Sequence, residues 1–465
     1  MILEHFTEST RKRLFLSPES YPHPFSDMNR QILKLAIPNI ISNITIPLLG
    51  LVGTMIAGQL GQEAAIGALS VGAAIFNMIY WTCSFIRMGT GGLTAQAFGA
   101  GKERECMNIL VRSAIVAIAV ALVLVVLRRP VWKLSLLMMS DNQAVMAMAA
   151  EYFFVRIWAA PASISLFAIH GWFIGMQDSK TPMFVSIISN VLNIALSALF
   201  ALRLGMGISG IGWAAVISQY TGLIVSWAFW IIKYRRYAKY ASLRESLRWK
   251  PLLGFFNINK DIFIRSLCNT AVYTFFTIAS TRFDAVTLAT NTILMQLFYL
   301  FSYISDGFGY AAEALTGKFV GAGDKASLKD AIRKMFRWSA VIAALYVTVY
   351  IFGWEQILGL FNATPAIIET ARNYIWWIIA VPLLGFVPFL IDGILYGATQ
   401  TKILRNTIIV ATAVYFGLFY GFVGSLGNTA IWLAFVSYIF TRGVLQLVVT
   451  RNLNTDMLME GRFYK

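Results

Sequence analysis

Charged or titratable side chains interrupt long apolar stretches of this chain, and five of them are candidates for a functional site: Arg87, His170, Asp306, Glu313 and Asp392. An Asp or Arg in the middle of a bilayer costs about 2.5–3.5 kcal/mol, so such residues are rare and by default indicate a functional site. Asp306 and Glu313 are about two helical turns apart and therefore share one face of a helix. Carboxylates in such a position can exchange protons or bind a cation.

Arg87 and His170 each have two possible roles. Arg87 cannot lose its proton, so it either holds a carboxylate in its ionised form or extends toward the nearer lipid headgroups. His170 belongs to the one residue type that ordinarily titrates near neutral pH, but a packed imidazole with one hydrogen bond is an equally ordinary role. Asp306 and Glu313 also have a structural alternative, which is to pair with Arg87 and hold helices together.

The sequence carries no motif for catalysis or metal binding. Its three cysteines, Cys83, Cys106 and Cys268, are far apart, and neither HExxH nor GxSxG occurs. We therefore predict no enzymatic activity, no metal and no cofactor. The net charge of +16 comes from basic residues in short loops between apolar stretches. There they fix membrane topology, and we expect no nucleic-acid partner.

The composition is that of a protein embedded in a lipid bilayer. Of 465 residues, 58% are hydrophobic and only 13% are charged, against about 25% charged in a soluble domain. Each crossing needs about 20 apolar residues. We count twelve apolar segments: 31–58, 63–98, 106–127, 145–176, 181–202, 208–232, 259–281, 285–320, 330–352, 366–398, 403–424 and 428–450.

The loops differ in charge from one side to the other. About 30 Lys and Arg residues lie on the side that holds residues 1–30 and 453–465, and five lie opposite. Basic loops stay in the cytoplasm. The sequence therefore predicts a multi-pass protein of the cell (inner) membrane with both termini cytoplasmic.

The two halves of the chain resemble each other at an offset of 222 residues. Gly99-Ala100-Gly101 then falls on Gly321-Ala322-Gly323, Gly171 on Gly393, and His170 on Asp392. Each half has six segments, so both enter the membrane in the same orientation. We predict an all-α membrane protein with two pseudo-symmetric six-helix bundles, 31–232 and 259–452, around a central cleft. A basic connection, 233–258, joins them.

Several motifs resemble the multidrug and toxic compound extrusion (MATE) family, most closely its DinF-like branch. In the first half they are Leu35-Ala36-Ile37-Pro38, Arg87-Met88-Gly89-Thr90, Ala95-Gln96-Ala97-Phe98-Gly99-Ala100-Gly101 and Leu192-Asn193-Ile194. In the second half they are Asp306-Gly307-Phe308, Ala312-Glu313-Ala314-Leu315 and Asp392-Gly393-Ile394-Leu395-Tyr396-Gly397-Ala398-Thr399. The resemblance implies a secondary exporter that expels organic, often cationic, compounds in exchange for H⁺ or Na⁺.

The chain departs from that family in its N-terminal half. Members usually carry an aspartate at the place of Gly53 and another four residues after the asparagine that matches Asn193, where this chain has Ser197. Both carboxylates thought to bind the coupling ion are thus altered here. We expect segments 1 and 5 to come together, with Asn193 in the remaining polar pocket. We expect coupling, if it persists, to use Asp306, Glu313 and Asp392.

Three functions remain open on these residues. The first is an ion-coupled exporter of small amphipathic compounds, and Arg87 against three carboxylates favours cationic cargo. The second is a flippase for a lipid or lipid-linked precursor, which a basic cavity would favour. The third is a transporter-like sensor or scaffold that has lost coupling. The oligomeric state is not predicted, although a monomer is compatible with the sequence.

Overall fold

The computed structural model describes residues 28–61, 63–136, 143–361 and 363–461. Within them, twelve helical spans are long and apolar enough to cross a membrane, and each overlaps one of the twelve predicted segments. The first six spans contain α2 (Met28–Gly58), α3 (Glu63–Cys83) with α4 (Phe85–Gly99), α5 (Glu103–Val126), α7 (Gln143–Arg156) with η1 (Ile157–Ala159) and α8 (Ala160–Gly175), α9 (Lys180–Ala198) with η2 (Leu199–Arg203), and α10 (Gly207–Tyr234) with η3 (Arg235–Tyr240). The last six are α12 (Trp249–Ser280), α13 (Ala285–Ala322), α14 (Lys325–Leu360), α16 (Ile375–Gly397), α17 (Thr401–Leu426) and α18 (Asn428–Val449).

Short helices lie between or after the spans. They are α6 (Arg128–Leu136), α11 (Leu243–Ser246), α15 (Pro365–Arg372) and α19 (Thr455–Glu460). The basic connection predicted over 233–258 is largely helical, because η3 and α11 lie in it and α12 already begins at Trp249. Lys250 and Lys260 remain exposed on α12, so the helix continues without burying their charges.

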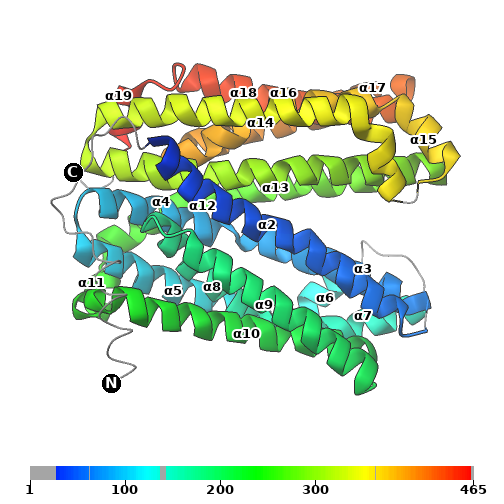
Figure 1. Ribbon diagram of the computed structural model, residues 1–465, viewed down its shortest axis with the longest axis horizontal. Helices are drawn as coiled ribbons and strands as arrows, with labels where there is room; N and C mark the ends of the chain where they lie inside the picture. The colour runs from blue at the N-terminus through cyan, green and yellow to red at the C-terminus, as the bar shows by residue number, and fades with distance from the viewer. Residues whose placement is uncertain (1–27, 62, 137–142, 362, 462–465) are drawn as a thin grey trace.

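The helices form two lobes that meet in the middle of the molecule. The N-lobe comprises α2 to α10 and the C-lobe comprises α12 to α18. In Figure 1 the lobes converge at the end that carries α11 and α19, here called the terminal face, and diverge toward the end that carries α6 and α15. Helix α2 crosses between them and packs against both α9 and α13.

Equivalent glycines confirm the internal repeat. Gly171 of α8 packs against the backbone of Arg87, and Gly393 of α16 packs against the backbone of Gly309. Arg87 and Gly309 are themselves related by the offset of 222 residues. The two helix crossings are therefore equivalent, as the sequence predicts.

The seam at the terminal face shows the same symmetry. Gly99 packs against the carbonyl of Lys318, and Gly321 packs reciprocally against the carbonyl of Gln96. A Cβ atom at either glycine would overlap that carbonyl. These close approaches let α4 and α13 meet across the pseudo-twofold axis.

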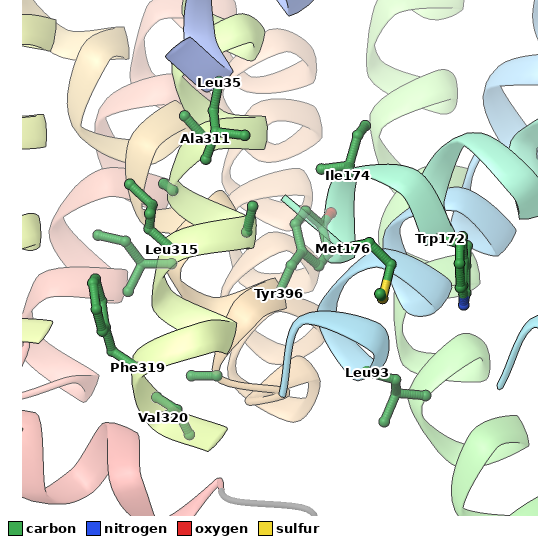
Figure 2. Packing of buried hydrophobic residues seen from close by; sticks show 14 of the residues in the cluster. Leu35, Leu93, Trp172, Ile174, Met176, Ala311, Leu315, Phe319, Val320 and Tyr396 are labelled. Atoms are coloured by element: carbon green, nitrogen blue, oxygen red, sulfur yellow. The ribbon is translucent and has the colours of Figure 1, made fainter. Parts of the chain in front are cut away.

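A buried apolar cluster joins the two lobes. Figure 2 shows Leu93 and Met176 of the N-lobe on one side and Leu315 and Phe319 of the C-lobe on the other. Leu93 and Leu315 are each 1% exposed. Because this apolar surface is shared, the lobes are held together near the terminal face by burial rather than by a few polar contacts.

Candidate functional site

A small cavity lies where α4 of the N-lobe meets α12, α13 and α16 of the C-lobe. Its volume is about 30 Å³, so the predicted central cleft is almost closed at this depth. The lining residues are Arg87, Met88, Arg265, Asp306, Gly309, Tyr310, Glu313, Phe389, Asp392, Gly393 and Tyr396. The structure thus brings four of the predicted site residues together: Arg87, Asp306, Glu313 and Asp392.

Glu313 and Arg87 form an ion pair between the two lobes. Their closest atoms, Glu313 Oε2 and Arg87 Nη1, are 3.5 Å apart, and the side chains are only 1% and 9% exposed. The lack of a side chain at Gly91 makes room for the Glu313 carboxylate. Neither carboxylate oxygen of Glu313 and neither terminal nitrogen of Arg87 has a hydrogen-bond partner among the described residues. The pair is therefore buried but incompletely satisfied.

Asp392 has a different environment, because two guanidinium groups contact it. Arg265 of α12 and Arg442 of α18 both donate to Asp392 Oδ2, the latter at 2.6 Å. Gln446 Nε2 donates to Asp392 Oδ1, also at 2.6 Å. All of these side chains are less than a tenth exposed. This network fixes α16 against α12 and α18.

These arginines overturn the charge count made from the sequence. Arg87 is not the lone cation opposite three carboxylates, since Arg265 and Arg442 lie in the same region. Three guanidinium groups balance Asp306, Glu313 and Asp392. The excess of negative charge that favoured cationic cargo is therefore absent.

Asp306 lines the cavity two helical turns from Glu313, on the shared face that the sequence predicts. It is half-buried. Its carboxylate has no hydrogen bond or ion pair within the described residues. Of the three acidic side chains it is thus the one with the freest access to the cavity.

His170 and the N-lobe polar residues lie outside this cavity. His170 Nε2 is buried without a hydrogen-bond partner in the described part of the chain, and the next residue, Gly171, packs on Arg87. Asn193 donates to Ser218 at 3.1 Å and accepts from Ser197 at 3.2 Å. This second polar cluster is internally satisfied and carries no charge.

The two helices of the altered family positions do come together. Asn190 of α9 donates to Thr45 of α2 at 2.7 Å, which confirms that segments 1 and 5 pack side by side. A Cβ atom at Gly53 would touch only the Leu69 side chain, at 3.6 Å. The structure therefore has space for a side chain at Gly53. Among the described residues, no group of His, Cys, Asp and Glu could hold a metal ion.

Comparison with known proteins gives one consistent family. The family model described as MatE matches the chain twice, over residues 38–199 and 262–423. The chain is 32% identical to the DNA damage-inducible protein F of Escherichia coli K12 over 427 residues, which cover 91% of this chain and 92% of that protein.

Two solved structures share the fold. One is an outward-facing conformation of a multidrug resistance MATE family transporter of the MOP superfamily, with a TM-score of 0.82, 19% identity, and coverage of 94% of this chain and 97% of that one. The other is a MOP superfamily transporter from Pyrococcus furiosus, for which a reversed polarity of the binding pocket was described as suggesting a different function. It has a TM-score of 0.82 and 18% identity over 94% of this chain and 97% of that one.

Proposed function

Because the chain belongs to the MatE family of membrane transporters, we propose that it exports small amphipathic compounds in exchange for protons, by alternating access of its two lobes. The observation that carries this proposal is the Arg87–Glu313 ion pair. It is the ion pair that links the lobes at the cavity, and one of its members is titratable. A proton on Glu313 removes the attraction between α4 and α13 at this point.

In this scheme the charge on Glu313 determines whether the lobes stay closed or part. With Glu313 ionised, the pair favours lobes that are closed toward the terminal face. Protonation of Glu313 leaves Arg87 without a counter-charge, and breaking a buried pair in this way typically costs about 3–5 kcal/mol. That cost is relieved when the lobes part and water or cargo reaches Arg87. Asp306, on the same face, is the second candidate for proton exchange.

Proton coupling gives the cycle a direction. By the positive-inside rule we place the terminal face in the cytoplasm, with both termini on that side of the cell membrane. Each unit charge that crosses also gains about 2.3 kcal/mol per 100 mV of membrane potential. No part of this scheme requires a metal or an organic cofactor.

The test is dye transport in proteoliposomes under an imposed ΔpH or an imposed ΔNa⁺. We expect transport with ΔpH and none with ΔNa⁺ alone. Glu313→Gln should lower the ΔpH-driven rate at least about tenfold, since general acid–base groups contribute factors of this order or more. Glu369→Gln, on the exposed helix α15, is the matched control and should transport at the native rate.

Three other outcomes would each contradict a stated part of this proposal. Native transport by Glu313→Gln would contradict coupling through this residue. Transport driven by ΔNa⁺ alone would replace the proton by sodium. Absence of any transport by the native protein would favour a transporter-like sensor or scaffold.

A lipid or lipid-linked flippase is the second candidate. It is favoured by Arg265 and Arg442, because phosphate-bearing cargo needs buried positive charge. Transfer of a fluorescent phospholipid between leaflets of the same proteoliposomes, with no release of soluble dye, would support it over the exporter.

A further inference from the structure

The guanidinium group of Arg87 is a buried cation whose terminal hydrogen-bond donors are unused within the described chain. Its two terminal nitrogens are buried without hydrogen-bond partners in the described chain, and the ion pair to Glu313 is long at 3.5 Å. Its guanidinium carbon lies over the ring of Tyr310, 3.9 Å from the ring centroid. This contact orients the group toward the cavity without using its donors.

Arg265 supplies a second donor to the same cavity. It donates to Asp392, but its Nε atom is buried without a partner among the residues described. Its guanidinium carbon lies 5.4 Å from the centroid of the Tyr396 ring. The Tyr396 hydroxyl is also buried and unpartnered. Unused donors from α4, α12 and α16 thus surround one small space.

Such an arrangement suits an oxyanion. Unsatisfied buried donors cost free energy, and a carboxylate or phosphate accepts several charge-assisted hydrogen bonds at once. The charged and titratable groups that line the cavity with Arg87 are Glu313, Asp306 and Tyr310 of α13, Tyr396 and Asp392 of α16, and Arg265 of α12. Arg442 of α18, which contacts Asp392, and His170 of α8 lie just outside the lining. With every carboxylate ionised these charges balance, and one proton on Glu313 leaves an excess of one positive charge.

We propose that Arg87 and Arg265 form a subsite for the oxyanion, a carboxylate or phosphate group, of an anionic amphipathic cargo, which replaces Glu313 as the counter-ion of Arg87. This inference rests on the proposed function, because it assigns the charge of the exported compound. The cavity of about 30 Å³ holds one or two water molecules at most. The oxyanion therefore enters when the lobes part, and its apolar body stays in the widened space between them.

The test measures binding to the full-length protein in detergent, without any gradient. The probes are a dansyl-labelled alkyl sulfonate, the corresponding neutral alcohol and the corresponding trimethylammonium compound. We expect the sulfonate to bind more tightly than either analogue. Its affinity should rise as the pH is lowered. Glu313→Gln, which mimics the protonated residue, should bind the sulfonate at least about tenfold more tightly at weakly basic pH and should lose most of the pH dependence.

Arginine variants complete the test. Arg87→Gln should weaken sulfonate binding at least about tenfold and leave the alcohol unchanged. Arg156→Gln is the matched control, because Arg156 also lies over an aromatic ring, that of Phe76 at 4.8 Å, but does not line the cavity. It should bind all three probes as the native protein does. The gain in affinity of Glu313→Gln keeps the test valid even if Arg87→Gln does not fold.

Preference of the native protein for the ammonium probe, or unchanged sulfonate affinity in Glu313→Gln, would overturn the subsite. The source of the oxyanion is decided by competition with lysophosphatidylglycerol. Displacement of the sulfonate identifies a lipid phosphate as a ligand, and no displacement identifies a non-lipid anion. Arg87-dependent binding without ΔpH-driven transport would leave the subsite standing and contradict proton-coupled export. ΔpH-driven transport of the ammonium probe alone would support proton-coupled export and contradict the oxyanion subsite.

Discussion

Asp392 and Glu313 are both buried carboxylates, but their partners differ. Asp392 accepts from Arg265, Arg442 and Gln446, so a proton there would leave two guanidinium groups uncompensated. Glu313 has one distant partner from the other lobe. We therefore propose separate roles: Asp392 stabilises the C-lobe, and Glu313 responds to protons.

Replacement of Asp392 should accordingly affect stability more than coupling. Asp392→Asn should lower the free energy of unfolding by about 3–5 kcal/mol, since it leaves buried charges unpaired. Arg442→Gln in the same chain should restore part of the loss. The melting temperature in detergent measures both effects. If Asp392→Asn melts like the native protein but loses ΔpH-driven transport, the assignment is reversed.

Sequence reasoning placed the acidic half of the cavity correctly and missed most of its basic half. Asp306, Glu313 and Asp392 were visible as charges within apolar segments, and so were Arg265 and Arg442 in segments 7 and 12. The signal was therefore present. Residue spacing does not predict that these two arginines, from helices far apart in the chain, both contact Asp392.

Asp178 gives a pH effect outside the membrane-spanning helices. Burial opposes its ionisation, but hydrogen bonds from Thr181 and the charge of Lys233 outweigh burial and hold the pKa of Asp178 below its ordinary value. Lys233 Nζ lies 3.0 Å from the carboxylate. A lowered pKa stabilises the fold above the ordinary pKa of the group, and the contribution is lost as the pH falls through the lowered value.

Asp178→Asn should therefore lower the melting temperature by about 2 °C at neutral pH, and the difference from the native protein should vanish in acid. Asp284→Asn is the control, because Asp284 caps α13 through Val286 and Thr287 and has no basic partner among the described residues. It should change the melting temperature less. A deficit of Asp178→Asn that persists in acid would show that charge is not the cause.

At the scale of the helices, the length of each apolar stretch predicts a membrane span, and the internal repeat predicts which spans of the two halves are equivalent. Neither predicts where a helix is interrupted within a span. The second span divides at Ser84 between α3 and α4, and segment 10 divides into α15 and α16 near Tyr374. The break at Ser84 lies in a largely apolar run, so tertiary packing rather than hydropathy decides its place. The break near Tyr374 follows the polar residues Glu369, Arg372 and Asn373.

The reciprocal glycine contacts make a prediction about conformation. Gly99→Ala and Gly321→Ala should each push α4 and α13 apart at the terminal face, because the added Cβ meets a backbone carbonyl that cannot rotate away. Spin labels at Arg235→Cys and Lys329→Cys, one on each lobe, should report a population with longer distances. Symmetry requires similar effects from the two substitutions.

Gly417→Ala is the matched control, since a Cβ there has nothing within 4 Å. Its distance distribution should equal that of the native protein. An effect of Gly99→Ala without any effect of Gly321→Ala would show that the two crossings are not mechanically equivalent, although their geometry is.

The whole molecule is closed at one end, and the C-terminal segment lies across that closure. The carbonyl of Gly461 accepts from Gln96 Nε2 of the N-lobe at 3.3 Å and from Thr399 Oγ1 of the C-lobe at 2.7 Å. Leu458 of α19 is buried, with 1% exposure. One short segment thus contacts both lobes at the seam where they meet.

Deletion of residues 455–465 should therefore destabilise the closed state relative to the open one. The hydrogen bond from Gln96 joins the segment to the N-lobe and exists only while the lobes are together, whereas the bond from Thr399 and the packing on α14 anchor the segment to the C-lobe. Loss of the segment therefore removes the free energy of the Gln96 contact from the closed state alone. We expect the spin-label pair at Arg235→Cys and Lys329→Cys to shift toward longer distances, and Leu458→Ala to produce part of the same shift. Glu460→Ala, exposed on the same helix, should leave the distances unchanged. An unaltered distribution in the truncated protein would mean that the seam between α4 and α13 holds the closed state without the C-terminal segment.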